Sequence, residues 1–127
     1  MPKRKILIVD DENDFTTMVK LNLEATGRYD VMVENIAVNA VNAALGYKPD
    51  LILLDVIMPG TEGPDIVSNM KEHAGLRDIP IVFLTATVRK AEVEQENGEI
   101  GGHVFIAKPC SLTELIDAIE NQFKDTG

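Results

Sequence analysis

Short apolar runs alternate along this chain with longer amphipathic segments. Four of the runs are continuously apolar, at residues 6–9, 51–54, 81–84 and 104–106, and a fifth at residues 29–33 alternates more strictly. Continuous apolar runs are typical of strands buried on both faces of a parallel sheet, whereas alternation suits an edge strand. The pattern therefore predicts five strands, with residues 29–33 at an edge.

The segments between the runs have the spacing of helices. In residues 13–26, Phe15, Met18, Val19 and Leu23 recur every three or four positions, and Gly27 suits the position after a helix end. Further helices are expected at residues 36–45, with Asn35 and Gly46 at the two ends, at residues 64–73, and from Ser111 onward, where Ser-Leu-Thr-Glu fits a capping box.

One segment fits this pattern poorly. Residues 88–99 carry only three apolar side chains among charged and amide residues. A helix there would bury little apolar surface, so we expect it to be short, mobile or partly unfolded. Glycines at 98, 101 and 102 indicate a loop before the last strand.

Regular alternation of strands and helices predicts an α/β fold. Such a chain forms a three-layer sandwich, with right-handed crossovers that place helices on both faces of a parallel sheet. The length of 127 residues suits one domain with one core, and we expect that core to span about residues 4–124.

Composition narrows the possible partners. No apolar run approaches the roughly 20 residues that cross a bilayer. A signal peptide would need a longer apolar region than residues 6–9, which end before Asp10. The single Cys110 cannot form an internal disulfide, which suits a reducing compartment. A net charge of −9 disfavours direct nucleic-acid binding. We expect a cytoplasmic protein without membrane contact.

Polar residues follow several of the predicted strands. Asp10 and Asp11 follow the first strand, Asp55 the third, Thr85 the fourth, and Lys108 the fifth. Ligands bind outside the carboxyl ends of the strands in open parallel sheets, so these five residues are expected to meet at one edge.

This set of residues suits phosphoryl chemistry with a metal ion. Close carboxylates repel one another unless a hard cation holds them, and Mg²⁺ prefers oxygen ligands and shares phosphate oxygens. A carboxylate can itself accept a phosphoryl group as an aspartyl-phosphate. The ammonium of Lys108 and the hydroxyl of Thr85 can bind phosphate oxygens.

The chain resembles the receiver domain of two-component response regulators over nearly its whole length, and its plan is closest to single-domain, chemotaxis-type regulators. The resemblance is carried by four segments in order, which are Ile-Leu-Ile-Val-Asp-Asp-Glu at 6–12, Leu-Asp-Val-Ile-Met-Pro-Gly at 54–60, Leu-Thr-Ala at 84–86 and Phe-Ile-Ala-Lys-Pro at 105–109. It implies a flavodoxin-like receiver fold with strand order 2-1-3-4-5.

The resemblance also implies a metal site and a phosphorylation site. Asp55 would accept the phosphoryl group from a phosphohistidine of a sensor histidine kinase or phosphotransfer protein. Asp11, Asp55 and the backbone carbonyl of Ile57 would bind Mg²⁺ directly, and Asp10 would act through a metal-bound water. Lys108 would pair with a phosphate oxygen.

The remaining implied roles concern switching. Thr85 would move toward the phosphate and Phe105 would turn inward, although plain core packing is an alternative for Phe105. The bond before Pro109 would be cis, which aims Lys108 at the site. The resulting change would control a downstream protein target or output domain, and the sequence suits both a complete protein and one domain of a larger regulator.

Ile57 departs from relatives that lose phosphate quickly, which tend to carry a polar group two positions after the acceptor. An apolar residue there shields the acyl phosphate, so we expect slow loss of phosphate. The expected chemistry is self-phosphorylation and self-dephosphorylation rather than turnover of a separate substrate.

Other functions fit less well. A phosphohydrolase with an aspartyl-phosphate usually has an Asp-x-Asp motif, but Ile57 stands two positions after Asp55. A receiver fold that no longer takes phosphate would be favoured by loss of Asp55, Lys108 or an acidic neighbour, and all are present. No glycine-rich phosphate loop follows the first strand, which disfavours a nucleotide-binding domain.

Overall fold

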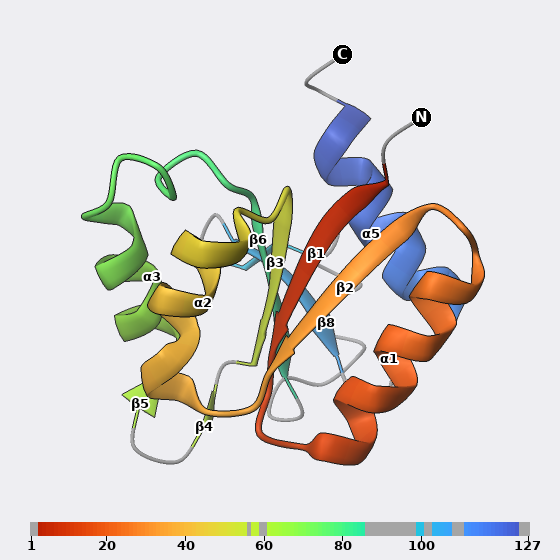
Figure 1. Ribbon diagram of the computed structural model, residues 1–127, viewed down its shortest axis with the longest axis horizontal. Helices are drawn as coiled ribbons and strands as arrows, with labels where there is room; N and C mark the ends of the chain where they lie inside the picture. Colours follow the sequence, from red (N-terminus) through yellow and green to blue (C-terminus); the bar gives the residue numbers. More distant parts are fainter. Residues whose placement is uncertain are drawn as a thin grey trace.

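Five parallel strands form the middle layer of a three-layer α/β sandwich (Figure 1). The computed structural model describes residues 3–55, 57–58, 61–85, 99–100, 103–107 and 111–124. The sheet has the order β2-β1-β3-β6-β8, made of β1 (Arg4–Val9), β2 (Tyr29–Glu34), β3 (Leu51–Asp55), β6 (Ile81–Thr85) and β8 (His103–Ala107). This arrangement confirms the expected parallel sheet with strand order 2-1-3-4-5.

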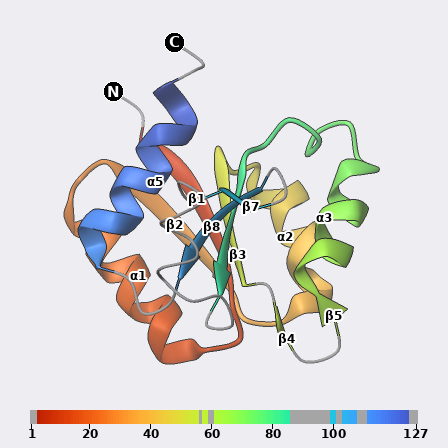
Figure 2. The same cartoon turned by 180° about the vertical axis from the view of Figure 1, so that it is seen from behind.

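Helices cover both faces of the sheet. Helices α1 (Asn13–Ala25) and α5 (Leu112–Lys124) lie on one face, and α2 (Ala40–Tyr47) and α3 (Gly63–Lys71) lie on the other, as the view from behind in Figure 2 also shows. No helix in the described part of the chain is both long and apolar enough to cross a membrane.

Three very short strands were not predicted. β4 (Ile57–Met58) and β5 (Thr61–Glu62) form an antiparallel hairpin after β3, and β7 (Glu99–Ile100) pairs antiparallel with β8 at the edge of the main sheet. Two-residue strands are too short to produce a recognisable alternation of apolar and polar residues. Apart from Glu99, the segment at 88–99 lies outside the described residues.

The apolar runs fill a core on each side of the sheet. In β1, Ile6 and Ile8 pack toward α1 and α5, whereas Leu7 and Val9 pack toward α2 and α3, and all four are fully buried. Alternate side chains of a strand point to opposite faces, so a strand between two helical layers must be apolar at every position. This explains why the central runs are continuously apolar.

Helix α1 follows its predicted pattern with one exception. Val19 and Leu23 are buried against the sheet, and Gly27 adopts φ 78° just beyond the helix, as expected for a glycine at that position. Met18 has the same spacing but is 46% exposed. It lies at the margin of the apolar stripe, beside the start of α5.

The second helix begins and ends later than predicted. A single 3₁₀ turn (Ala37–Asn39) precedes α2, and the helix ends at Tyr47 with Lys48 in the left-handed conformation at φ 55°. The Lys48 amide donates to the Ala44 carbonyl at 2.8 Å, which closes the last turn. The expected end at Gly46 was therefore wrong.

The later helices agree more closely with the sequence. Helix α3 runs from Gly63 to Lys71, close to the predicted 64–73. Before α5, the Oγ atom of Ser111 accepts a hydrogen bond from the Glu114 amide at 3.1 Å, which confirms the predicted cap.

The open edge of the sheet at β2 is covered by a pair of charged side chains from α1. Lys20 Nζ donates to the Val31 carbonyl at 2.7 Å, and the Val31 amide donates to Glu24 Oε2 at 3.1 Å. The two side chains also pair at 3.0 Å. The hydrogen bond from the Val31 amide, and to a lesser extent the one from Lys20, lowers the pKa of Glu24. The pair therefore satisfies edge backbone groups that another chain could otherwise bind.

Replacing Lys48 should stabilise the fold. Lys48→Gly is expected to raise the free energy of unfolding by about 1 kcal/mol, because glycine enters the left-handed region without the steric cost that a Cβ brings. Urea denaturation measures the change. The control is Asn42→Gly in the middle of α2, which should be destabilising, and a loss of stability in Lys48→Gly would contradict the prediction.

Candidate functional site

Three carboxylates meet at the carboxyl edge of the sheet. Asp10 and Asp11 follow β1, and Asp55 ends β3. The two strands are parallel neighbours with Val9 opposite Leu54, so their ends reach the same edge. One oxygen from each of the three carboxylates lies within 4.8 Å of the others. The structure thus brings together the three acidic residues that the sequence singled out.

The three carboxylates differ in their exposure. Asp10 is fully buried and Asp55 is only 6% exposed, whereas Asp11 is exposed to solvent. The backbone amide of Glu12 donates to Asp10 Oδ1 at 3.0 Å, which fixes one oxygen of that carboxylate. Charges that are removed from water this far require compensation by hydrogen bonds or by opposite charge.

This set of donors fits a hard divalent cation. All three side chains offer oxygen ligands, and two of them come from the rigid ends of neighbouring strands. Mg²⁺ is commonly held by one or two carboxylates and shares phosphate oxygens, so these residues suit a magnesium ion that acts on a phosphoryl group. A cation here would also relieve the mutual repulsion of the carboxylates.

A second set of polar contacts holds the loop that carries Asp10 and Asp11. Asn35 Nδ2 donates to the Asp10 carbonyl at 2.7 Å and to Thr16 Oγ1 at 3.0 Å. The Thr16 hydroxyl donates in turn to the Asn13 carbonyl at 3.1 Å. The expectation that Asn35 caps the following helix was wrong, because Ile36 precedes the 3₁₀ turn without a side-chain cap and Asn39 precedes α2. The Asn35 amide nitrogen binds the end of β1 instead. In the sequence, the only indication of this contact was an amide residue, Asn35, directly after the predicted edge strand.

The other predicted site residues are only partly described. Thr85 ends β6 opposite Ala107, and its strand neighbour Leu84 lies opposite Asp55, so the Thr85 backbone reaches the acidic edge. Phe105 lies in β8 opposite Phe83. The predicted roles of their side chains lie outside what the structure describes.

Two further predicted positions lie beyond the described residues, and a third is described only as backbone. Lys108 and Pro109 follow directly after β8, whose last residue, Ala107, is at the same sheet edge as Thr85. The backbone of Ile57 forms β4 opposite Glu62, two residues after Asp55. The use of the Ile57 carbonyl as a metal ligand stays a prediction.

Sequence comparison places these residues in a known family. Residues 6–120 match the family model described as the response regulator receiver domain. The phosphate regulon transcriptional regulatory protein PhoB of Escherichia coli (strain K12) is 40% identical over 120 residues, which cover 92% of this chain and 50% of that protein. PhoB of Klebsiella pneumoniae is 41% identical with the same coverage. The chain thus spans about half the length of the curated relatives it matches.

Solved structures of receiver domains share the fold of this chain. The chemotaxis protein CheY4 of Vibrio cholerae superimposes with a TM-score of 0.79 at 26% identity, covering 94% of this chain and 98% of that one. The BeF3-activated N-terminal receiver domain of RstA from Klebsiella pneumoniae gives a TM-score of 0.77 at 26% identity, covering 95% and 99%.

Removing one charge from the acidic cluster should stabilise the protein when no divalent cation is present. Asp11→Asn is expected to raise the free energy of unfolding by roughly 0.5–1 kcal/mol in EDTA, since the exposed Asp11 repels its two neighbours through a partly aqueous medium. Urea denaturation with EDTA and with excess MgCl₂ measures the effect, and the advantage should shrink or reverse with Mg²⁺.

The matched control for this measurement is Asp14→Asn. Asp14 is exposed in the first turn of α1, where a negative charge is favourable. Its replacement should therefore lower stability slightly, with or without Mg²⁺. A destabilised Asp11→Asn in EDTA would show that repulsion does not dominate at the cluster.

Proposed function

Since this chain belongs to the receiver domain family of two-component response regulators, we propose that Asp55 is its phosphate acceptor. The proposal is carried by one observation, the meeting of Asp10, Asp11 and Asp55 at the carboxyl edge of a parallel sheet with their oxygens within 4.8 Å. The donor would be a phosphohistidine on a sensor histidine kinase or phosphotransfer protein.

The proposed Mg²⁺ site consists of Asp11, Asp55 and the carbonyl of Ile57, with Asp10 acting through a water. The ion would neutralise charge on the phosphoryl oxygens. Asp10, fully buried and fixed by the Glu12 amide, suits a role behind the metal, whereas the exposed Asp11 can face it from solvent. Until a cation binds, the carboxylates of Asp10 and Asp11 surround Asp55 with negative charge.

The chain itself supplies the nucleophile for the transfer. A carboxylate oxygen of Asp55 forms a bond to phosphorus while the bond from phosphorus to the histidine nitrogen breaks, and that nitrogen keeps the electron pair. Lys108 would balance charge on the phosphoryl oxygens and Thr85 would donate to one of them. In this reaction the protein modifies only itself, and we propose that it acts as a switch rather than as a conventional enzyme.

Phosphorylation would then shift the protein between two conformations. Thr85 and Phe105 are the proposed moving residues, and both belong to neighbouring strands, β6 and β8, that reach the acidic edge. A phosphate bound by Thr85 favours the conformation that makes this contact, and the shift in population is the output.

The downstream partner would be a protein target or an attached output domain. The curated relatives, of which this chain spans about half, are named transcriptional regulatory proteins. For this chain, the net charge of −9 favours a protein over nucleic acid as the direct partner. A cytoplasmic location stays a prediction that the family supports.

Acetyl phosphate provides the direct test. With Mg²⁺, intact-mass spectrometry should show one added phosphate on the wild-type protein and none on Asp55→Ala. Asp14→Ala is the matched control, since Asp14 is exposed on α1 outside the cluster, and it should be phosphorylated like the wild type. Persistence of the phosphate in Asp55→Ala would refute the assignment.

The same samples report how long the phosphate remains. After removal of acetyl phosphate, we expect the modified species to decay slowly, because apolar Ile57 does not assist an attacking water. Ile57→Asn should shorten the lifetime. A lifetime of seconds for the wild type at neutral pH would contradict this expectation.

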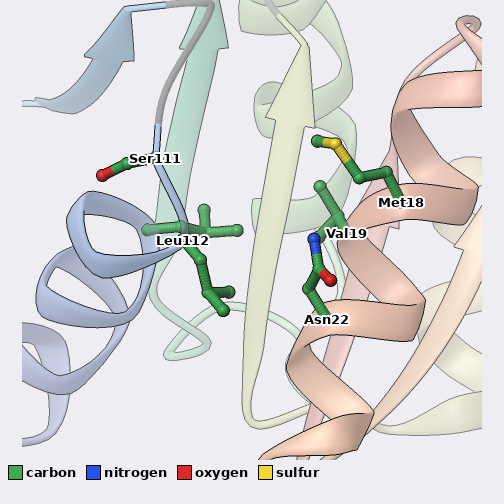
Figure 3. A pocket seen from close by; sticks show the side chains of 6 residues that line it. Met18, Val19, Asn22, Ser111 and Leu112 are labelled. Atoms are coloured by element: carbon green, nitrogen blue, oxygen red, sulfur yellow. The ribbon is translucent and has the colours of Figure 1, made fainter.

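A pocket between α1 and α5 is the proposed contact surface for the phosphodonor protein. Met18, Val19, Asn22, Ser111, Leu112 and Leu115 line it, and Figure 3 shows the α1 side chains facing the start of α5. Met18 is 46% exposed and Leu112 is 38% exposed, so the pocket presents apolar surface to solvent. Both helices begin near the acidic edge, since α1 follows β1 and α5 follows β8.

A charge in this pocket should slow phosphorylation by a protein donor but not by the small donor acetyl phosphate. Met18→Glu is expected to slow transfer from a phosphorylated histidine kinase about tenfold, the effect of losing one well-packed contact, and to leave phosphorylation by acetyl phosphate unchanged. The control is Leu45→Glu, which changes a partly exposed leucine of α2 on the opposite face. Equal slowing by both variants would argue against a specific surface.

A further inference from the structure

Asn35 lies at the end of the edge strand β2, outside the acidic cluster, but it contacts the loop that carries two of the three carboxylates. Its amide nitrogen donates one hydrogen bond to the Asp10 carbonyl at 2.7 Å and one to Thr16 Oγ1 at 3.0 Å. Asn35 is half-buried and Thr16 is 1% exposed, so water competes little for these bonds. One side chain thus links β2, the end of β1 and the first turn of α1.

This link needs two hydrogens from one side chain, and the amide nitrogen of Asn35 supplies both. The Asp10 carbonyl can only accept. The Thr16 hydroxyl uses its hydrogen on the Asn13 carbonyl at 3.1 Å, so it accepts from Asn35. Both hydrogens of the Asn35 amide nitrogen therefore have acceptors. A carboxylate at this position would face two oxygens without a hydrogen to donate, and a methyl group would leave the Asp10 carbonyl without this partner.

The link fixes the loop from several directions. The Asp10 amide donates to the Glu34 carbonyl at 3.1 Å, so both backbone groups of Asp10 are held by the end of β2. On the other side, the Thr16 amide donates to the Glu12 carbonyl at 3.0 Å and its hydroxyl holds Asn13. Asp11 lies in the loop between these fixed points.

We propose that Asn35, supported by the Thr16 hydroxyl, is a positioning residue for the divalent cation site, holding the loop at residues 10–13 so that Asp10 and Asp11 face Asp55. This inference rests on the proposed function, in which these carboxylates bind Mg²⁺. Replacing a side chain that orients a metal ligand typically lowers metal affinity or activity roughly 10–100-fold. Asn35 would touch neither metal nor phosphate, and its effect would pass through the Asp10 backbone.

Metal binding without any phosphoryl donor gives the test. Mn²⁺ is titrated into the full chain, and the concentration of free Mn²⁺ is measured by electron paramagnetic resonance. Mg²⁺ is then added as a competitor to obtain its dissociation constant. Asn35→Ala should raise the dissociation constant for both ions about tenfold, as replacements in the surroundings of a metal ligand typically do. Asn42→Ala, which removes an exposed amide from α2, should leave it unchanged.

A second pair of variants keeps the proposal testable if Asn35→Ala folds poorly. Thr16→Val removes the hydroxyl with little change in volume and should weaken metal binding roughly threefold, since one hydrogen bond of the link is lost. Thr16→Ser keeps the hydroxyl and should bind like the wild type. A purely structural role would lower the urea midpoint in EDTA for these variants while the folded protein kept its metal affinity, and that result would overturn the proposal.

The two levels of the proposal fail differently. If the wild-type protein does not bind Mn²⁺, or if Asp11→Asn binds as well as the wild type, the proposed metal site is wrong and the inference fails with it. If the wild type binds and Asp11→Asn does not, while Asn35→Ala and Thr16→Val match the wild type, only the positioning role is overturned.

Discussion

The parallel pairing of β1 with β3 is the constraint on which the acidic site depends. With Val9 opposite Leu54, the next residues of each strand come out at the same edge, and these are Asp10 and Asp55. A shift of the register by one residue would exchange the side chains of a whole strand between the two cores, and close packing of differently shaped side chains in each core opposes this exchange. The energy that fixes the carboxylates therefore comes mainly from buried aliphatic residues a few ångströms away.

That same packing makes the site costly. The strand ends deliver two nearly buried carboxylates to one place, and a third joins them from a loop. Such an arrangement opposes folding unless hydrogen bonds and a cation offset the repulsion. The favourable free energy of burying the apolar core must therefore exceed the unfavourable free energy of the site. If the proposed cation binds here, it would relieve this repulsion before any phosphoryl group arrives.

The sequence predicted the features that follow from long patterns. Continuous apolar runs indicated buried parallel strands, and the strand-end rule then brought Asp10, Asp11 and Asp55 together without any knowledge of the register. What it could not predict depended on single contacts across the fold. Asn35 looked like a helix cap because caps are local, whereas its actual acceptor, the Asp10 carbonyl, is distant along the chain and close only through strand pairing. The end of α2 was predicted at Gly46 because glycine usually adopts the left-handed conformation there. In the structure, Lys48 adopts that conformation instead.

Helix α1 is attached to the sheet near both of its ends. Close to its start, Thr16 is tied to Asn35, and toward its end Lys20 and Glu24 hold the backbone of Val31. A helix anchored at two points to an edge strand can neither slide nor rotate without breaking several hydrogen bonds. The exposed Leu21 between these anchors is therefore a natural place for a spectroscopic label, because a distance measured from it would report the displacement of other elements against a stationary reference.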